Sequence, residues 1–327
     1  MILASNHQNA FLDALMIECS ARKKSHFLAR ASAFKNKIAL ALLSYIRMMP
    51  IYRIRDGLGE VKKNDEIIEK CSSILRKGGV INLFPEGNHN LDWRVRSMQR
   101  GLARIVFDAA TKDNWQTDIK IVPSGIQYES PTGFRSRVLV RFGKPLSVNK
   151  YKEVYEENNR AGMDELGKDL EEALKPLVVN LQPASDYAEL REKYIESRPY
   201  KKDYIEQVNC DIKIAQALSD REALPEYSSD KPRRFYIHNY LFGIIAFANN
   251  ILPFLITRAL IRSIVKDPAF ISSIKIACGI GVVPIFYIIQ TTVVWYFFGL
   301  PAAAGYFVLL FVSGHFGFDW LKKLYNH

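Results

Sequence analysis

Hydrophobic and polar positions follow two different periods along residues 1–150. Short runs of β-type residues predict strands at Ile2–Ser5, His26–Arg30, Met49–Arg53, Val80–Phe84, Ile119–Pro123 and Val138–Phe142. Stretches with a 3.6-residue period predict helices at Phe11–Arg22, Lys35–Arg47, Asn64–Lys77 and Gly101–Ala110. Strands that alternate with helices predict an α/β domain, with a mixed, mostly parallel sheet flanked by helices.

The pattern changes after residue 150. Residues 151–234 are charged and helical in character, and Asp164–Leu177 has the spacing of an amphipathic helix. This segment predicts a helical connector, and Tyr227–Arg234 reads as a linker at its end.

No charged residue occurs from Ile276 to Gly314. One membrane span needs about 20 apolar residues, so this stretch is long enough for two. Gly299-Leu300-Pro301 would break a helix near its middle. We therefore expect a C-terminal membrane-embedded region with a transmembrane hairpin at 276–318, split into 276–298 and 301–318. The alternative is a very apolar hairpin in a protein core.

Residues 235–257 are also apolar but carry His238, Asn249, Asn250 and Pro253. Arginines and lysines flank this segment on both sides, which disfavours a simple crossing. An interfacial helix, or a re-entrant pair broken near Asn249–Pro253, fits better than a full span. Basic residues at both ends of the later hairpin place both of its ends, and the α/β domain, on the cytoplasmic side of a multi-pass protein.

The formal charge of +11 suits either an anionic lipid surface or nucleic acid. With a membrane hairpin in the chain, we expect a lipid bilayer and no nucleic acid. The four cysteines, Cys19, Cys71, Cys210 and Cys278, form no CxxC pair. This spacing predicts neither a disulfide framework nor a metal site.

His7 and Asp13 are the first candidate catalytic residues. His7 follows the predicted first strand, at the carboxyl end where α/β folds bind ligands, and Asp13 falls in the first turn of the next helix. A carboxylate can hold one imidazole nitrogen and leave the other free to take a proton from a hydroxyl. The pair requires a turn between the two residues. The alternative is an aspartate that stabilises a helix N-terminus beside a histidine that merely packs.

Two further groups stand at predicted strand ends. Glu86 and Gly87 follow the strand that ends at Phe84, where a carboxylate can accept hydrogen bonds from a polyol and a glycine permits close approach. Arg53 and Arg55 alternate, so both can face one phosphate group. The alternatives are a plain turn and a solvated strand end.

One α/β domain carries a His-Asp pair, an Arg pair and a Pro-Glu-Gly turn in that order, each at a predicted strand end, and a run from Ile121 to Tyr128, IVPSGIQY, follows them. Together they resemble the membrane-bound glycerolipid acyltransferase superfamily, which includes glycerol-3-phosphate and lysophosphatidate acyltransferases. The resemblance covers residues 2 to about 150. Five residues rather than four separate His7 from Asp13, and Asn88-His89-Asn90 replaces the usual Thr-Arg-Ser. Both departures resemble the glycerol-3-phosphate/dihydroxyacetone-phosphate branch and leave open which residue takes the role of the usual arginine.

The resemblance implies an O-acyltransferase of phospholipid biosynthesis with a His-Asp general base. His7 would take the proton of the acceptor hydroxyl and Asp13 would orient it. The resemblance further implies an acceptor site formed by Arg53, Arg55, Glu86 and Gly87, and an acyl-donor site lined by Val122 and Pro123. No cofactor or metal is implied, because the thioester of acyl-CoA or acyl-carrier protein is already activated.

We expect glycerol-3-phosphate as the acceptor, with 1-acylglycerol-3-phosphate as the alternative. Two further alternatives are a non-catalytic lipid-binding membrane protein and a thioesterase. The family usually has a membrane-contacting segment before the histidine motif, and only six residues precede His7 here. We therefore expect a native chain that starts further upstream.

Overall fold

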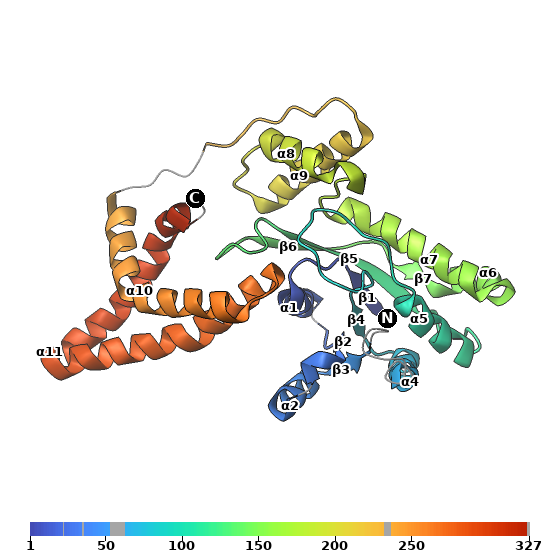
Figure 1. Ribbon diagram of the computed structural model, residues 1–327, viewed down its shortest axis with the longest axis horizontal. Coiled ribbons are helices and arrows are strands. Elements are labelled where there is room, and N and C mark those ends of the chain that lie inside the picture. Colours follow the sequence, from blue (N-terminus) through green and yellow to red (C-terminus); the bar gives the residue numbers. More distant parts are fainter. Residues whose placement is uncertain (22, 35, 53–62, 232–236, 326–327) are drawn as a thin grey trace. The chain divides into compact units, whose positions relative to one another are not determined.

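The computed structural model describes residues 1–21, 23–34, 36–52, 63–231 and 237–325 (Figure 1). The chain divides into two compact units, which are treated separately below. The α/β unit comprises Met1–Tyr128 and Val138–Asp230. The helical unit comprises Glu129–Arg137 and Lys231–His327.

The described part of the α/β unit contains a seven-stranded mixed sheet with the order β3-β2-β4-β1-β5-β6, and β7 also pairs with β5. Pairs among β1 to β5 are parallel, whereas β6 and β7 run antiparallel to β5. This confirms the predicted fold class. The strands are β1 (Ile2–Ser5), β2 (His26–Arg30), β3 (Met48–Ile51), β4 (Ile81–Leu83), β5 (Lys120–Tyr128), β6 (Val138–Phe142) and β7 (Leu146–Ser147).

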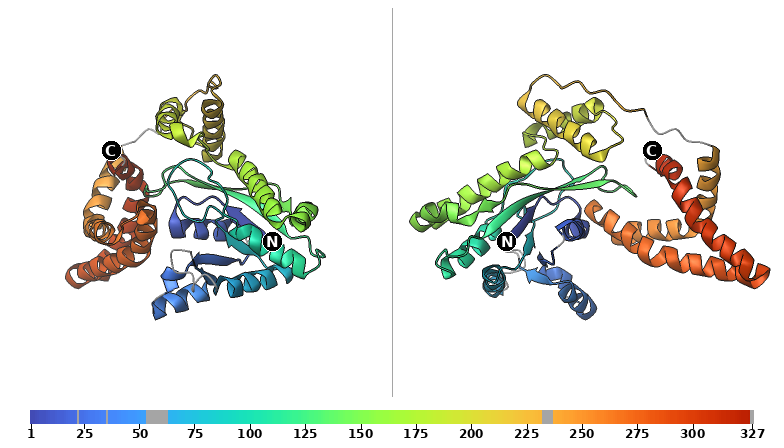
Figure 2. Two further views of the ribbon diagram at one scale, coloured as in Figure 1. Left: turned by 45° about the vertical axis from the view of Figure 1, so that its right-hand side comes forward. Right: turned by 180° about the vertical axis from the view of Figure 1, so that it is seen from behind.

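Helices cover both faces of this sheet (Figure 2). Ile2 and Ala4 of β1 pack in one apolar cluster with residues of α4 (Lys63–Arg76), α5 (Gly101–Lys112) and α7 (Asn159–Leu174), whereas Leu3 packs in another with residues of α1 (Ala10–Ala21). This alternation is typical of a sheet buried on both sides. The helices before the connector are α1 (Ala10–Ala21), α2 (Lys37–Tyr45), α4 (Lys63–Arg76) and α5 (Gly101–Lys112).

β5 is longer than predicted, because the strand does not end at Pro123. Pro123 lies between the stretch of β5 that pairs with β7 and the stretch that pairs with β6. A proline has no N–H to donate, and the strand tolerates it at this change of partner. β5 therefore continues to Tyr128, which brings that residue to the carboxyl end of the sheet.

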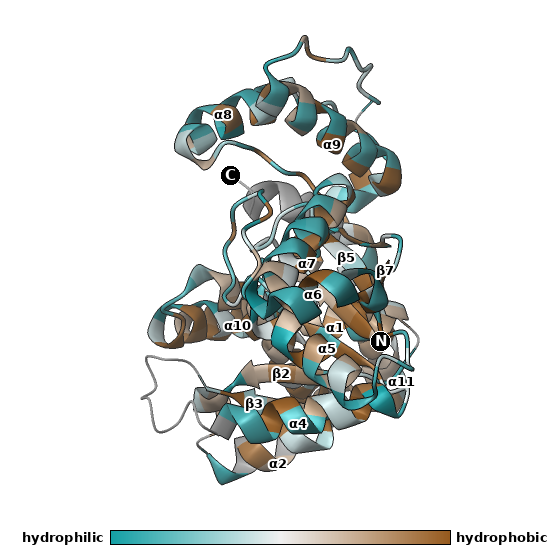
Figure 3. Ribbon diagram, turned by 90° about the vertical axis from the view of Figure 1, so that its right-hand side faces the viewer, coloured by the Kyte–Doolittle hydropathy of each residue, from teal (hydrophilic) through white to brown (hydrophobic). Residues whose placement is uncertain are grey.

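The predicted connector is helical and packs within the α/β unit as far as Asp230. Its helices are α6 (Lys152–Glu157), α7 (Asn159–Leu174), α8 (Tyr187–Ser197) and α9 (Tyr204–Asp220). Leu166, Leu170 and Leu174 recur every four residues along α7 and are all buried against the sheet. Figure 3 shows hydrophilic residues interspersed along α6 and α7, as expected for amphipathic helices at a surface.

In the helical unit, α10 (Ile237–Ile264) packs against α11 (Ile271–Tyr325). α11 consists of two helices joined at Gly299, whose φ of 79° lies in the left-handed region. The break predicted at 299–301 is therefore present. The segments Ile237–Ile264 and Pro268–Gly317 are long and apolar enough to cross a membrane.

α10 is continuous through Asn249–Pro253, where the re-entrant alternative required a break, and it bends along its length (Figures 1 and 2). Pro253 lacks the N–H that would bond to the Asn249 carbonyl four residues earlier. Gln290 Nε2 donates to that carbonyl at 2.9 Å instead. The Tyr306 hydroxyl donates to Asn249 Oδ1 at 2.8 Å, so one residue of α10 is bonded to both halves of α11.

Candidate active site

The turn between β1 and α1 brings the first candidate residues together. The Asn6 side chain accepts from the backbone N–H of Ile126 at 2.7 Å and donates to its carbonyl at 3.0 Å. Asn6 thereby continues the pairing of β1 with β5 beyond the end of the strand. His7 is the next residue, and the chain then turns back into α1, which begins at Ala10.

Asp13 is completely buried and receives four hydrogen bonds. Its Oδ2 accepts from His7 Nδ1 at 2.8 Å, from the Gln8 backbone N–H at 2.8 Å and from the Asn9 backbone N–H at 2.7 Å. Its Oδ1 accepts from the Tyr128 hydroxyl at 2.7 Å. The aspartate therefore both caps the helix N-terminus and holds the histidine ring, and the turn that the predicted pair required is present.

Because His7 donates its Nδ1 proton to a carboxylate, its Nε2 carries the free lone pair. The ring stacks on Phe84, with 4.1 Å between centroids, and meets the edge of His89 at 5.5 Å. The His7 side chain keeps 15% of its surface exposed. An imidazole held in this way can accept a proton from a bound hydroxyl at Nε2.

Glu86 stands in a turn that ends β4, next to the His7 turn. Gly87 has a φ of 77°, which a side chain would strain, and its N–H donates to the Phe84 carbonyl. Glu86 is 6% exposed, and its carboxylate accepts from the His7 backbone N–H at 3.3 Å. The same carboxylate is paired with the Arg96 guanidinium, which also donates to the Asn88 carbonyl and to the His7 carbonyl.

Burial and charge act in opposite directions on Glu86. Burial raises the pKa of its carboxyl, and the Arg96 guanidinium beside it partly reverses the rise; burial is the larger effect. The Glu86–Arg96 pair therefore bonds both the N–H and the carbonyl of His7, from the turn that follows β4. The described contacts of Glu86 are thus with protein groups that fix the backbone of His7.

Two of the other predicted residues are less closely connected to this cluster. Val122 packs in the apolar cluster around Leu3, and Pro123 is buried within β5. Tyr128, five residues further along the strand, is the residue of β5 that reaches Asp13. Arg53 and Arg55 lie outside the described residues. The roles predicted for these residues remain predictions.

Sequence reasoning missed Arg96 and the contact of Tyr128 with Asp13. Arg96 belongs to the pair Arg94 and Arg96, which has the same alternation as Arg53 and Arg55 and follows Glu86 by ten residues. Tyr128 ends the run IVPSGIQY and stands two residues after Ile126. If β5 continues beyond Pro123, the two side chains share one face of the strand, and this pattern could have pointed to Tyr128.

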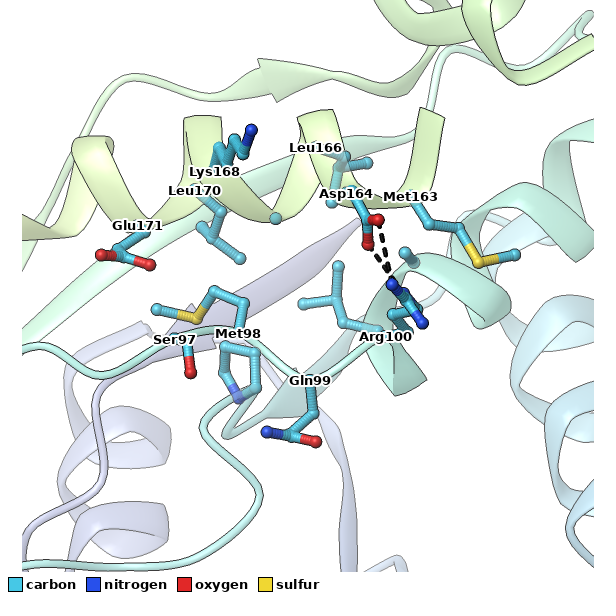
Figure 4. Close-up of a pocket in the computed structure, with 14 residues that line it drawn as sticks. Ser97, Met98, Gln99, Arg100, Met163, Asp164, Leu166, Lys168, Leu170 and Glu171 are labelled. Carbon is cyan, nitrogen blue, oxygen red and sulfur yellow. Dashed lines mark hydrogen bonds and ion pairs between the residues drawn. The ribbon is translucent and has the colours of Figure 1, made fainter. Parts of the chain in front are cut away.

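A hollow of about 250 Å³ lies between residues 97–103 and α7 (Figure 4). Arg100 and Asp164 point toward each other there, with Nε to Oδ1 at 2.7 Å, and the side chains of Leu166 and Leu170 come from the same helix as Asp164. Pro85 borders the hollow, but His7 does not line it. Among the described residues, no group of three or more His, Cys, Asp or Glu side chains could hold a metal ion.

The resemblance to glycerolipid acyltransferases rests on the Asn-His turn, the aspartate behind the histidine and the Pro-Glu-Gly turn, and the structure brings these together at one end of an α/β sheet. Residues 1–127 match the family model described as Acyltransferase. This match confirms, for this part of the chain, the resemblance drawn from the sequence motifs.

Individual relatives match the same part of the chain. Glycerol-3-phosphate O-acyltransferase 2 of Saccharomyces cerevisiae is 28% identical over 125 residues, which is 38% of this chain and 16% of that protein. The chloroplastic 1-acyl-sn-glycerol-3-phosphate acyltransferase LPAT1 of Arabidopsis thaliana is 27% identical over 122 residues, which is 37% of this chain and 30% of that protein. The matched region thus spans less than a third of either relative.

A solved structure is also similar, namely the 1-acyl-sn-glycerophosphate acyltransferase PlsC from Thermotoga maritima. The alignment has a TM-score of 0.36 and 19% identity, and it covers 54% of this chain and 66% of that one.

Proposed function

We propose that this protein transfers a fatty acyl group from an acyl thioester to a hydroxyl group of glycerol-3-phosphate. The observation that carries the proposal is the contact of His7 Nδ1 with Asp13 Oδ2, which leaves Nε2 free at the carboxyl end of a parallel sheet. The family match over residues 1–127 and the name of the yeast relative support the reaction class.

In the proposed reaction, His7 Nε2 takes the proton of the acceptor hydroxyl as its oxygen attacks the thioester carbonyl. The carbon–sulfur bond breaks, the imidazolium returns the proton to the sulfur, and the products are an ester and a free thiol. General base catalysis supplies about 10²–10⁴-fold, and positioning of the two substrates supplies much of the remainder. No metal or cofactor is required in this scheme.

The acceptor phosphate would bind Arg53 and Arg55. Glu86 and Gly87 would position the glycerol part beside His7, and Val122 and Pro123 would help line the acyl-donor site. The contacts of Arg96 with Glu86 and the His7 carbonyl support a role for Arg96 in holding this turn.

The second candidate acceptor is 1-acylglycerol-3-phosphate. It is favoured by the similarity to the plant enzyme, whose name specifies that acceptor.

A labelled-product assay separates the two acceptors. Purified protein is given radiolabelled acyl-CoA, or acyl-carrier protein, with each acceptor in turn, and the lipids are separated by thin-layer chromatography. A monoacyl product from glycerol-3-phosphate supports the first acceptor. A diacyl product without any monoacyl product supports the second, and release of free thiol without an acceptor indicates a thioesterase. No thiol release with any donor and acceptor supports the non-catalytic lipid-binding alternative.

Arg53 can be tested in the same assay. Arg53→Ala is expected to raise the KM for the acceptor about tenfold or more, because one charge-assisted bond to the phosphate is lost. The KM for the acyl donor should stay the same. An unchanged acceptor KM removes Arg53 from the phosphate site.

We also propose that the helical unit anchors the protein in a bilayer with both ends of the α11 hairpin facing the cytoplasm. The apolar segments and the basic residues that flank them support this arrangement. Single cysteines introduced near Gly299 and near Lys323 test it by labelling from each side of sealed vesicles. Equal labelling of both from one side contradicts the hairpin.

A further inference from the structure

The Tyr128 hydroxyl reaches the side of Asp13 that the histidine does not use. Tyr128 is the last residue of β5 and is 3% exposed. Its hydroxyl donates to Asp13 Oδ1 at 2.7 Å, whereas His7 Nδ1 and two backbone N–H groups all donate to Oδ2. Tyr128 is therefore the donor that the described contacts give to Oδ1.

A carboxylate with donors on both oxygens cannot rotate about its χ2 torsion without losing one of them. The buried position also makes each donor important, because an ionised carboxylate away from water is stable only when its oxygens are hydrogen-bonded. Burial and the neighbouring Asp13 charge both raise the pKa of Tyr128 well above its ordinary value. Its hydroxyl hence stays protonated and remains a donor at any pH at which an enzyme works.

We propose that Tyr128 is a positioning residue that fixes the plane and the charge of the Asp13 carboxylate, and through it the orientation and basicity of His7. The proposal rests on the proposed acyl transfer, in which His7 is the general base. The phenol takes up part of the carboxylate charge on Oδ1, and the remaining charge on Oδ2 determines how strongly a protonated His7 is stabilised.

The other groups that face His7 come from the turn after β4. Glu86 accepts from the His7 backbone N–H, and Arg96 donates to the His7 carbonyl. The His89 ring meets the His7 ring edge-on, and Phe84 stacks on it. These four groups are unchanged in a variant that lacks only the Tyr128 hydroxyl, and any change in the titration of His7 in that variant is carried by Asp13.

The test is Tyr128→Phe, which removes one hydroxyl and keeps the ring. Loss of the donor leaves more negative charge on the carboxylate, which stabilises the imidazolium and raises the pKa of His7. The acid limb of the kcat profile should shift to higher pH by about half a unit or more, and kcat at pH 7 should fall about tenfold. The KM for the acceptor should change little, since Tyr128 touches Asp13 rather than substrate.

Tyr151→Phe is the matched control. Tyr151 is also a buried tyrosine, and its hydroxyl donates to Asp169 Oδ2 at 2.8 Å in the same unit. This variant should lose comparable stability and keep the wild-type kcat and pH profile. If both variants lose activity equally with unchanged pH profiles, Tyr128 is only structural and the proposal is overturned.

A second measurement separates this proposal from the proposed function. Diethyl pyrocarbonate modifies neutral imidazole, so the rate of its reaction at His7 against pH, read by peptide mass spectrometry, reports the His7 titration without any substrate. A labelling midpoint that moves up in Tyr128→Phe and not in Tyr151→Phe supports the positioning role even if acyl transfer is absent. A midpoint that stays in place overturns it even if acyl transfer is confirmed.

Discussion

Two polar clusters in this protein are built by opposite rules. In the α/β unit, His7, Asp13, Glu86 and Arg96 bring ionisable groups together at the carboxyl ends of strands β1 and β4. In the helical unit, Asn249, Gln290 and Tyr306 bring neutral groups together between apolar helices. The first cluster has charges whose balance matters, whereas the second only completes hydrogen bonds.

The difference shows how a polar cluster in an apolar setting can be interpreted. Gln290 bonds to the carbonyl that Pro253 leaves without a helical partner, so the position of Gln290 in the helical unit is explained by the backbone alone. The backbone does not explain why a histidine should occupy the fourth donor position of Asp13. An ionisable side chain that bonds another ionisable group, and satisfies no backbone group, is therefore a candidate for a chemical role.

The largest effect is expected where this difference is greatest, at His7. His7→Ala should lower kcat by about 10²–10⁴-fold, because the acceptor hydroxyl loses its general base. The fold should persist, since Asp13 retains the N–H groups of Gln8 and Asn9 and the Tyr128 hydroxyl. Initial-rate assays and a thermal melt of the same preparation check both statements. If the variant kept full activity, His7 would be a structural residue, as Gln290 is.

The sequence was sufficient for the part of the site that depends on local geometry. His7 and Asp13 are six residues apart, and a strand followed by a helix leaves little freedom for the turn between them. The break of α11 at Gly299 and the strands β1, β2 and β6 were likewise predictable from short-range patterns. In each case the physical cause lies within a few residues of its effect.

Contacts that depend on strand register were not predictable in the same way. Pro123 suggested that β5 ends early, and only the sheet shows that the strand passes from β7 to β6 at this point. Tyr128 was therefore not linked to Asp13, which is 115 residues away in the sequence. Arg96 was missed because Arg53 and Arg55 show the same alternation and were the arginine pair to which the resemblance assigned the acceptor site.

Arg96 allows the charged cluster to be tested by stability. Arg96→Met leaves the buried Glu86 carboxylate without its ion pair, and we expect a loss of about 3 kcal/mol in the free energy of unfolding at neutral pH. The loss would be measured by chemical or thermal unfolding in detergent. Arg100→Met is a control, since its pair with Asp164 is solvent-exposed and should matter little.

The pH dependence of the same variant sharpens this test. The folded pKa of Glu86 is raised, so between its ordinary value and its raised value the native state holds a proton that the unfolded state has released. Stability therefore falls as pH rises through that window. Removing Arg96 takes away the charge that opposes the rise, so the window should extend to higher pH. The double variant Glu86→Gln/Arg96→Met should lose this dependence; if it keeps the slope, another group is responsible.

The smallest effect is expected in the neutral cluster. Gln290→Leu leaves the Asn249 carbonyl without its donor, and we expect a loss of about 1–2 kcal/mol in stability with no effect on the pH profile of catalysis. Pro253→Ala supplies the missing backbone N–H, so the same Gln290→Leu change made in the Pro253→Ala background should cost much less. Thermal melts of the four proteins in one detergent give this double-mutant cycle. Equal losses in both backgrounds would mean that Gln290 does not act through the carbonyl that the proline frees. The interpretation of the helical-unit cluster as one that satisfies the backbone would then be wrong.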